Sequence, residues 1–135
     1  MSTSTIPYAL IVDDDPLILL HAGEILEEAG FRLYEAGTGD EAIGILDDHA
    51  GSVVLLFSDV EMPGKTDGFA LARHVDSIWP HIEIVIASGR VKPQPGQMPD
   101  KATFIGKPFS NQMVLSHLRE TLPDCKKPHP LRQAV

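Results

Sequence analysis

The sequence predicts an α/β fold in which a doubly wound, five-stranded parallel sheet carries helices on both faces. Three observations indicate this architecture. Short apolar runs alternate with longer amphipathic stretches along the chain, as in strand–helix–strand units. Residues 53–57 are wholly apolar, which is typical of a central parallel strand covered on both faces. Polar side chains directly follow several of the predicted strands, at the edge where open α/β sheets place their sites.

The first predicted unit is a strand, a helix and a second strand. Residues 8–12 form an apolar run that ends in acids. Asp15 and Pro16 then open a helix, because an aspartate caps free amides and a proline tolerates the first helical position. Apolar residues recur at helical spacing as far as Gly30, which we expect to end the helix in a left-handed conformation. Residues 31–36 alternate in polarity and form the second strand.

The middle of the chain predicts a turn at 37–40, a helix at 41–49 and the central strand at 53–57. A loop follows over residues 61–67. It contains a Pro-Gly pair and must bend sharply. Residues 68–77 carry apolar positions at helical spacing and form the third helix.

The last third predicts strands at 82–87 and 104–106 and a final helix at 111–122, capped by Ser110. Between the two strands, residues 91–100 occupy the place of a fourth helix. This segment contains three prolines and a glycine, and each interior proline costs a helix about 3 kcal/mol. We therefore expect the fourth helix to be short, late or absent.

Length and composition limit the classes of protein to which this chain can belong. The chain has 135 residues, 43% of them hydrophobic, which suits one domain with a buried core. We expect an N-terminal tail at 1–7, a domain at 8–122 and a flexible, proline-rich tail at 123–135. The formal net charge of −8 argues against direct nucleic-acid binding.

The same composition favours a cytoplasmic protein. The one cysteine excludes an internal disulfide and fits a reducing compartment. The N-terminus lacks the basic start and apolar stretch of a signal peptide. No apolar run approaches the roughly 20 residues that span a bilayer, so we expect no membrane insertion.

The strand ends predict one functional pocket. Parallel strands end at a common edge, which should gather the carboxylates of Asp13, Asp14 and Asp59, the hydroxyl of Ser88 and the ammonium of Lys107. Crowded carboxylates repel one another unless a cation joins them, and oxygen ligands of this kind suit Mg²⁺. Such a site is suited to receiving a phosphoryl group.

At these residues the chain resembles the receiver domain of two-component response regulators. The matching pieces are residues 11–16, 58–64, 67–68, 87–89 and 107–109. One piece alone would be a weak signal, but all of them in the right order and at the right intervals are highly specific. The likeness runs roughly from residue 8 to 122 and implies a flavodoxin-like fold.

The resemblance implies a role for each acid. Asp59 is the expected phosphoacceptor, which receives its phosphoryl group from a phosphohistidine on a histidine kinase or a histidine phosphotransfer protein. Asp14 is the expected direct Mg²⁺ ligand, and Asp13 supports the metal through water. Glu61 contributes its backbone carbonyl, while its side chain leans over the pocket and either discourages or orients the hydrolytic water. Asp15 is better explained as a helix cap than as a ligand.

The resemblance also implies a switch. Lys107 pairs with the phosphoryl oxygens, and Pro108 after it suggests a cis peptide. Ser88 donates its hydroxyl to the phosphoryl group and draws its loop inward. Phe104 stands where the family has an aromatic switch residue, although a plain core phenylalanine is an equal alternative.

Two departures from the family stand out. The loop after Asp59 is one residue longer than the common form and resembles the variant seen in receivers attached to, or paired with, certain sensor kinases. The proline-rich segment 91–100 lies on the face that receivers usually present to output partners, which makes this face unusual.

The sequence favours the interpretation that the protein is a non-enzymatic, phosphorylatable switch that acts on an unidentified downstream protein. We expect a stand-alone receiver, since the chain ends soon after its last helix. A receiver excised from a hybrid histidine kinase or a longer regulator is the main alternative. A Mg²⁺-dependent phosphatase with a nucleophile in the Asp13–Asp15 run is less favoured because the chain has no cap domain. A pseudo-receiver that switches without phosphate is disfavoured because every chemical residue is present.

Overall fold

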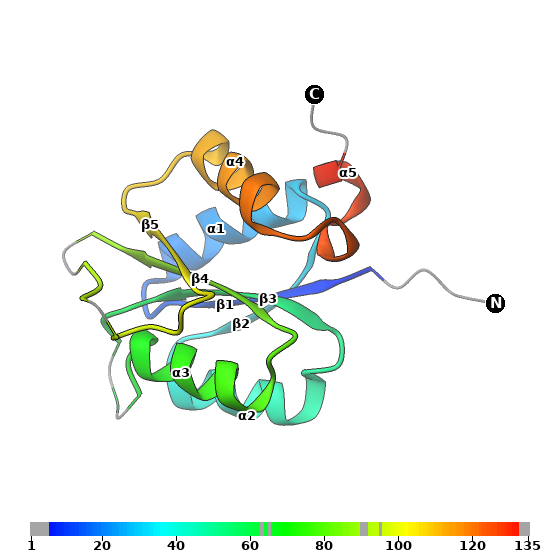
Figure 1. Cartoon of the computed structure of the whole chain (residues 1–135). Coiled ribbons are helices and arrows are strands. Elements are labelled where there is room, and N and C mark those ends of the chain that lie inside the picture. Colours follow the sequence, from blue (N-terminus) through cyan, green and yellow to red (C-terminus); the bar gives the residue numbers. More distant parts are fainter. Residues whose placement is uncertain (1–5, 63, 65, 90–91, 95, 133–135) are drawn as a thin grey trace.

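The computed structural model describes residues 6–62, 64, 66–89, 92–94 and 96–132. Five parallel strands form one sheet in the order β2-β1-β3-β4-β5 (Figure 1). The strands are β1 (Tyr8–Val12), β2 (Arg32–Ala36), β3 (Val53–Asp59), β4 (Glu83–Ser88) and β5 (Thr103–Gly106). The main helices are α1 (Pro16–Glu28), α2 (Gly39–His49), α3 (Gly68–Ile78) and α4 (Asn111–Thr121). This strand order confirms the predicted flavodoxin-like, doubly wound sheet.

Helices cover both faces of the sheet. Figure 1 shows α1 and α4 on one face and α2 and α3 on the other. The central strand feeds both layers because its side chains alternate. Leu55 and Phe57 belong to the core under α1 and α4, while Leu56 between them belongs to the core under α2 and α3. This two-sided burial explains why strand β3 carries no polar residue before Ser58.

Both predicted ends of α1 are confirmed. The Asp15 carboxylate accepts a hydrogen bond from the Leu17 amide at 2.9 Å. At the other end Gly30 has a φ of +104°, and the Phe31 amide donates to the Leu26 carbonyl. Together with the bond from the Gly30 amide to Glu27, this pattern is a Schellman cap.

The other helix starts follow the same capping chemistry, with small shifts from the expected bounds. Thr38 caps α2, Asp67 caps α3 and Ser110 caps α4, as expected for the last. Helix α2 begins at Gly39, inside the segment expected as a turn. The reason is local, since the Thr38 hydroxyl accepts from the Glu41 amide at 3.1 Å and starts the helix two residues early.

The fourth helix expected between β4 and β5 is absent from the described part of that crossover, which lacks residues 90, 91 and 95. The described residues of the crossover instead contact helix α3 and the residues that follow it. The Arg73 guanidinium donates to the Gln97 carbonyl. The Lys101 ammonium donates to the Pro80 carbonyl and lies 3.7 Å from Asp76. Prolines disfavour a helix here, and side-chain hydrogen bonds from Arg73 of α3 and from Lys101 of the crossover hold the described residues instead.

The C-terminal stretch differs from the flexible tail that the sequence suggested. It forms a short 3₁₀ helix, Asp124–Lys126, and helix α5, His129–Arg132. Leu131 is only 1% exposed and joins the core under α1 and α4. A Cβ on Gly30 would lie 2.7 Å from the Pro128 Cβ, so the glycine leaves the room for this segment.

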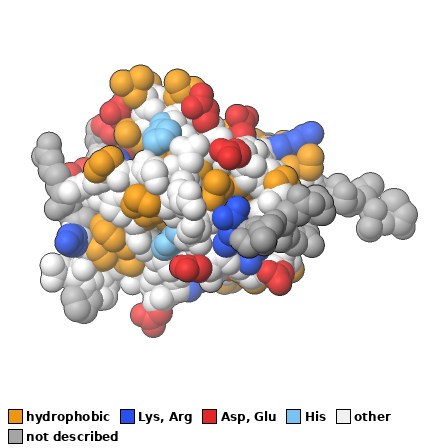
Figure 2. All heavy atoms as spheres, turned by 90° about the horizontal axis from the view of Figure 1, so that it is seen from above, with side chains coloured by type: hydrophobic (Ala, Val, Ile, Leu, Met, Phe, Trp, Pro, Cys, Tyr) orange, Lys and Arg blue, Asp and Glu red, His pale blue; other side chains and the backbone are white. Residues whose placement is uncertain are grey.

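The surface of the α1–α4 layer mixes hydrophobic and charged side chains, as Figure 2 shows. Leu17 and Leu20 on α1 and Met113 on α4 are exposed. Among the described residues, no helix combines the length and the apolar character needed to cross a bilayer.

Candidate functional site

The register of the sheet aligns the predicted site residues. Strand partners along its C-terminal edge are Val12 with Ser58, Asp59 with Ala87, and Ser88 with Gly106. The residue after β1 is Asp13 and the residue after β5 is Lys107. Four strands therefore deliver their polar ends to one edge, as the sequence predicted.

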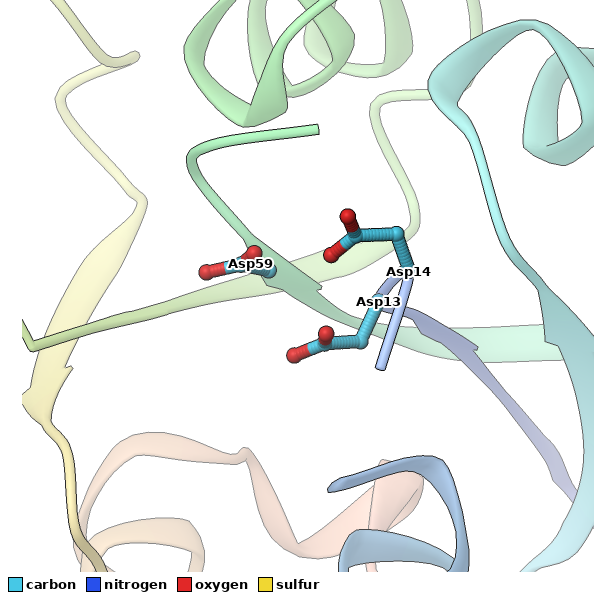
Figure 3. Close-up of side chains that lie close together, drawn as sticks. All are labelled: Asp13, Asp14 and Asp59. Carbon is cyan, nitrogen blue, oxygen red and sulfur yellow. The ribbon is translucent and has the colours of Figure 1, made fainter. Parts of the chain in front are cut away.

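Three carboxylates gather at this edge. Asp13, Asp14 and Asp59 offer oxygen atoms that all lie within 4.8 Å of one another. Figure 3 shows the three side chains at the adjoining ends of β1 and β3. Asp13 and Asp59 are buried, while Asp14 is exposed. The group thus has two buried carboxylates and one that is exposed to solvent.

Lys107 bridges the two buried carboxylates. Its Nζ lies 2.9 Å from Asp13 Oδ2 and 3.0 Å from Asp59 Oδ1. Although burial opposes the charged ammonium, the hydrogen bonds to the two aspartates outweigh it and raise the pKa of Lys107. The peptide between Lys107 and Pro108 is cis, which confirms that prediction. The lysine remains a fixed positive charge in the pocket.

Asp59 sits in a conflicting electrostatic environment. Burial raises the pKa of its carboxyl, the hydrogen bond from Lys107 lowers it, and the neighbouring Asp13 raises it again, with a net upward shift. One ammonium cannot balance three carboxylates. A divalent cation bound by oxygen ligands would do so, and the donor set of this cluster fits Mg²⁺.

A pocket of about 400 Å³ opens beside the carboxylates. It is lined by Asp59, Glu61, Ser88, Gly89 and Lys107. The structure therefore brings Glu61 and Ser88 to the same site as Asp59 and Lys107. Ser88 is 4% exposed and contributes to this lining from the end of β4.

Phe104 lies apart from this lining. It is partly buried on β5, opposite Ile86, and packs against the core under α2 and α3. It stands two residues before Gly106, the strand partner of Ser88. Its role as a switch residue stays a prediction.

Sequence reasoning missed two features around Asp59. Gly68 packs so tightly that a Cβ there would lie 2.0 Å from the Asp59 carbonyl oxygen. The Thr66 hydroxyl donates to Asp40 Oδ1 at 2.8 Å. The Asp-Gly pair at 67–68 carried a signal for the first feature. The second joins residues 26 positions apart, and no local pattern indicates it.

Comparisons with known proteins agree with this geometry. The family model of the response regulator receiver domain matches residues 9–119. The sensor kinase CckA of Brucella abortus (strain 2308) is 30% identical over 116 residues, which cover 84% of this chain and 12% of that protein. The transcriptional regulatory protein CpxR of Escherichia coli (strain K12) is 30% identical over 115 residues, which cover 84% of this chain and 48% of that protein. The chain thus spans less than half the length of either relative.

Solved structures show the same fold. The chemotaxis response regulator CheY4 of Vibrio cholerae superposes with a TM-score of 0.75 and 26% identity, over 87% of this chain and all of that chain. The receiver domain from the hybrid histidine kinase CckA superposes with a TM-score of 0.71 and 28% identity, over 86% of this chain and 99% of that chain.

Receiver domains are generally non-enzymatic signalling domains. They interact with histidine kinases or phosphotransfer proteins and typically use Mg²⁺ at an acidic pocket. The match over residues 9–119 covers most of this chain. The chain therefore belongs to the response regulator receiver domain family of two-component systems.

Proposed function

We propose that this receiver accepts a phosphoryl group on Asp59 from a phosphohistidine and thereby acts as a conformational switch. The donor is a histidine kinase or a histidine phosphotransfer protein, and the output is a contact with a downstream protein. The observation that carries the proposal is the position of Asp59. It ends the central strand, lines the pocket and lies 3.0 Å from the ammonium of Lys107.

The transfer needs a carboxylate nucleophile. A carboxylate oxygen of Asp59 attacks the phosphorus, the bond between phosphorus and the histidine nitrogen breaks, and that nitrogen keeps the electron pair. Burial raises the pKa of Asp59, whereas the hydrogen bond from Lys107 counters this shift. Lys107 therefore helps to keep Asp59 ionised, and its charge favours the approach of a phosphoryl group.

The remaining pocket residues would bind and orient the phosphoryl oxygens. We assign Lys107 and the Ser88 hydroxyl to these oxygens, because both line the same pocket as Asp59. Asp13, Asp14 and Asp59, with the backbone carbonyl of Glu61, would hold Mg²⁺. The bound ion supplies charge compensation for the phosphoryl oxygens and the carboxylates.

The switch follows from a change of partners. Lys107 bonds Asp13 and Asp59 in this structure, and a phosphoryl group would add close to two negative charges and strong acceptors beside it. Ser88 is then drawn toward the new acceptor and moves the end of β4. Its strand partner is Gly106, and Phe104 lies on the same short strand, so we assign Phe104 the responding position.

Intact-mass analysis after incubation with acetyl phosphate and Mg²⁺ tests this function. We expect one added phosphoryl group in the wild type and none in Asp59→Asn. In Asp14→Ala the labelling should lose its Mg²⁺ dependence. Asp47→Asn is the matched control, because it changes an exposed aspartate on α2 outside the pocket and should label normally. Normal labelling of Asp59→Asn would contradict the assignment.

The same assay separates the remaining alternatives. Repeated turnover of a small phosphate ester, instead of one stoichiometric label, would indicate the phosphatase. The relatives include both a sensor kinase and a transcriptional regulator, so a receiver of this type serves in either arrangement. Labelling from purified phosphotransfer proteins, compared by rate, would identify the preferred donor.

A further inference from the structure

The loop after Asp59 is held at both of its ends. The Gly68 amide donates to the Val60 carbonyl at 2.8 Å, which ties the two ends of the loop together. A Cβ on Gly68 would lie 2.0 Å from the Asp59 carbonyl oxygen, so only glycine allows this closure. The loop therefore begins and ends directly beside the predicted phosphoacceptor.

The same loop is also attached to helix α2. The Thr66 hydroxyl donates to Asp40 Oδ1 at 2.8 Å, and Asp40 lies in the first turn of that helix. Beside this bond, a Cβ on Gly39 would lie 2.5 Å from the Thr66 carbonyl oxygen. At the start of α2, Gly39 thus leaves room for the close approach of the loop, and Asp40 accepts the hydrogen bond from the Thr66 hydroxyl. Such a bond to a carboxylate is stronger than one between neutral groups.

The attached loop carries part of the pocket. Glu61 lines the pocket beside Asp59 and Lys107, five residues before Thr66. Under the proposed function, the backbone carbonyl of Glu61 is a ligand for Mg²⁺. A loop with an extra residue has more freedom to move this carbonyl, and ordering each backbone residue costs conformational entropy. A second attachment point reduces that freedom before the metal binds.

We propose that Thr66 and Asp40 form a latch that positions the loop of Glu61 for Mg²⁺ binding. This inference rests on the proposed function, because it concerns the same metal site. Thr66 and Asp40 are positioning residues, since neither lines the pocket. The latch makes the extra length of this loop compatible with a preformed site.

Calorimetric titration of the full chain with MgCl₂ tests the latch without any phosphorylation. Thr66→Val removes the hydroxyl and keeps the shape of the side chain. We expect its dissociation constant for Mg²⁺ to rise about three- to tenfold, the effect of losing one hydrogen bond. Thr66→Ser keeps the hydroxyl and should restore wild-type affinity. Asp40→Ala should weaken binding by the same factor as Thr66→Val, and the double variant no further.

Ser52→Ala is the matched control. It removes a hydroxyl that donates to the His49 carbonyl at 3.0 Å, beyond the opposite end of α2, and should leave Mg²⁺ affinity unchanged. Wild-type affinity in Thr66→Val, even with a lower melting temperature, would overturn the latch and leave the proposed function intact. A wild-type chain that binds no Mg²⁺ would overturn the proposed metal site itself, and the latch with it.

Discussion

Lys107 and Asp13 lie 94 residues apart in the sequence, yet a hydrogen bond of 2.9 Å joins the Lys107 ammonium to Asp13 Oδ2. The same ammonium also bonds Asp59, so it connects the ends of β1, β3 and β5. These two carboxylates hold the lysine in place as long as nothing else competes for it. A cation that takes over the carboxylates, or an anion that attracts the ammonium, changes this arrangement directly.

Replacing Lys107 with methionine should raise the pKa of Asp59 further. Burial already raises that pKa above its usual 3.8, and the hydrogen bond from Lys107 opposes the rise. Without it, ionising Asp59 requires a higher pH. Removing one preorganised charge should also slow labelling by acetyl phosphate about 100-fold. Carbon-13 NMR titration of the Asp59 carboxyl without Mg²⁺ and labelling rates against pH provide the two measurements.

Lys126→Met is the control for this experiment, because Lys126 pairs with Glu83 at the start of β4 and is outside the lining of the pocket. It should leave both the Asp59 titration and the labelling rate as in the wild type. An unchanged Asp59 titration in Lys107→Met would show that the lysine does not stabilise this carboxylate.

Asp59→Asn should stabilise the fold at neutral pH in the absence of Mg²⁺. The pKa of Asp59 is raised in the folded state, so the carboxyl favours folding below its unfolded pKa of 3.8 and loses that contribution as the pH rises through the folded pKa. Asparagine avoids this loss. The pocket is open to water, so we expect a gain of about 0.5–1 kcal/mol at pH 7.

Urea unfolding with and without Mg²⁺ measures this difference. Adding Mg²⁺ should stabilise the wild type and shrink the gap, because a ligand that binds only the folded state raises its stability. A variant less stable than the wild type at pH 7 without Mg²⁺ would show that the Lys107 bond outweighs the burial of Asp59.

Local chemistry in the sequence predicted the sheet and most of the site. Strand ends could be placed because Asp13, Asp59 and Lys107 each follow an apolar run, and parallel strands share one functional edge. The start of α1 at Asp15 and its end at Gly30 follow from capping rules that need only a few residues. The lack of a helix among the described residues between β4 and β5 followed from the prolines of that segment.

The parts that the sequence did not predict depend on contacts between distant segments. Leu131 stands among prolines and basic residues, and nothing near it indicates that it fills the core beside α1. The space that receives this segment is created by Gly30, about 100 residues earlier, whose role as a helix cap was visible but whose role in packing was not. The bond between Thr66 and Asp40 has the same character.

His117 should make the fold less stable in mild acid. It lies on α4 with its Nε2 2.8 Å from the Thr103 hydroxyl, and burial lowers its pKa although Glu120 opposes the shift. The unfolded chain therefore binds a proton near pH 6.5 before the folded chain does. Stability is complete above that pH and falls as the pH drops from 6.5 through the folded pKa.

Urea unfolding of the wild type and His117→Gln across pH 5 to 8 measures this contribution. The variant should lose less stability on acidification than the wild type. The comparison at pH 7.5, where the wild-type histidine is neutral, separates the change in packing from the change in proton binding. Equal acid sensitivity of the two proteins would assign the pH dependence to other groups.

Leu131→Ala should destabilise the fold by about 2–4 kcal/mol, the usual cost of deleting a buried leucine side chain. Leu131 is 1% exposed in the core shared with α1 and α4, and Lys126 ties the same segment to Glu83 at 2.7 Å. Leu17→Ala is the matched control, because Leu17 is 74% exposed and its truncation should change stability by less than about 0.5 kcal/mol. Urea unfolding compares the two. The buried position of Leu131 requires a larger loss of stability in Leu131→Ala than in Leu17→Ala. Equal losses in the two variants would mean that the domain ends near residue 122 and that the C-terminal segment adds nothing to its stability.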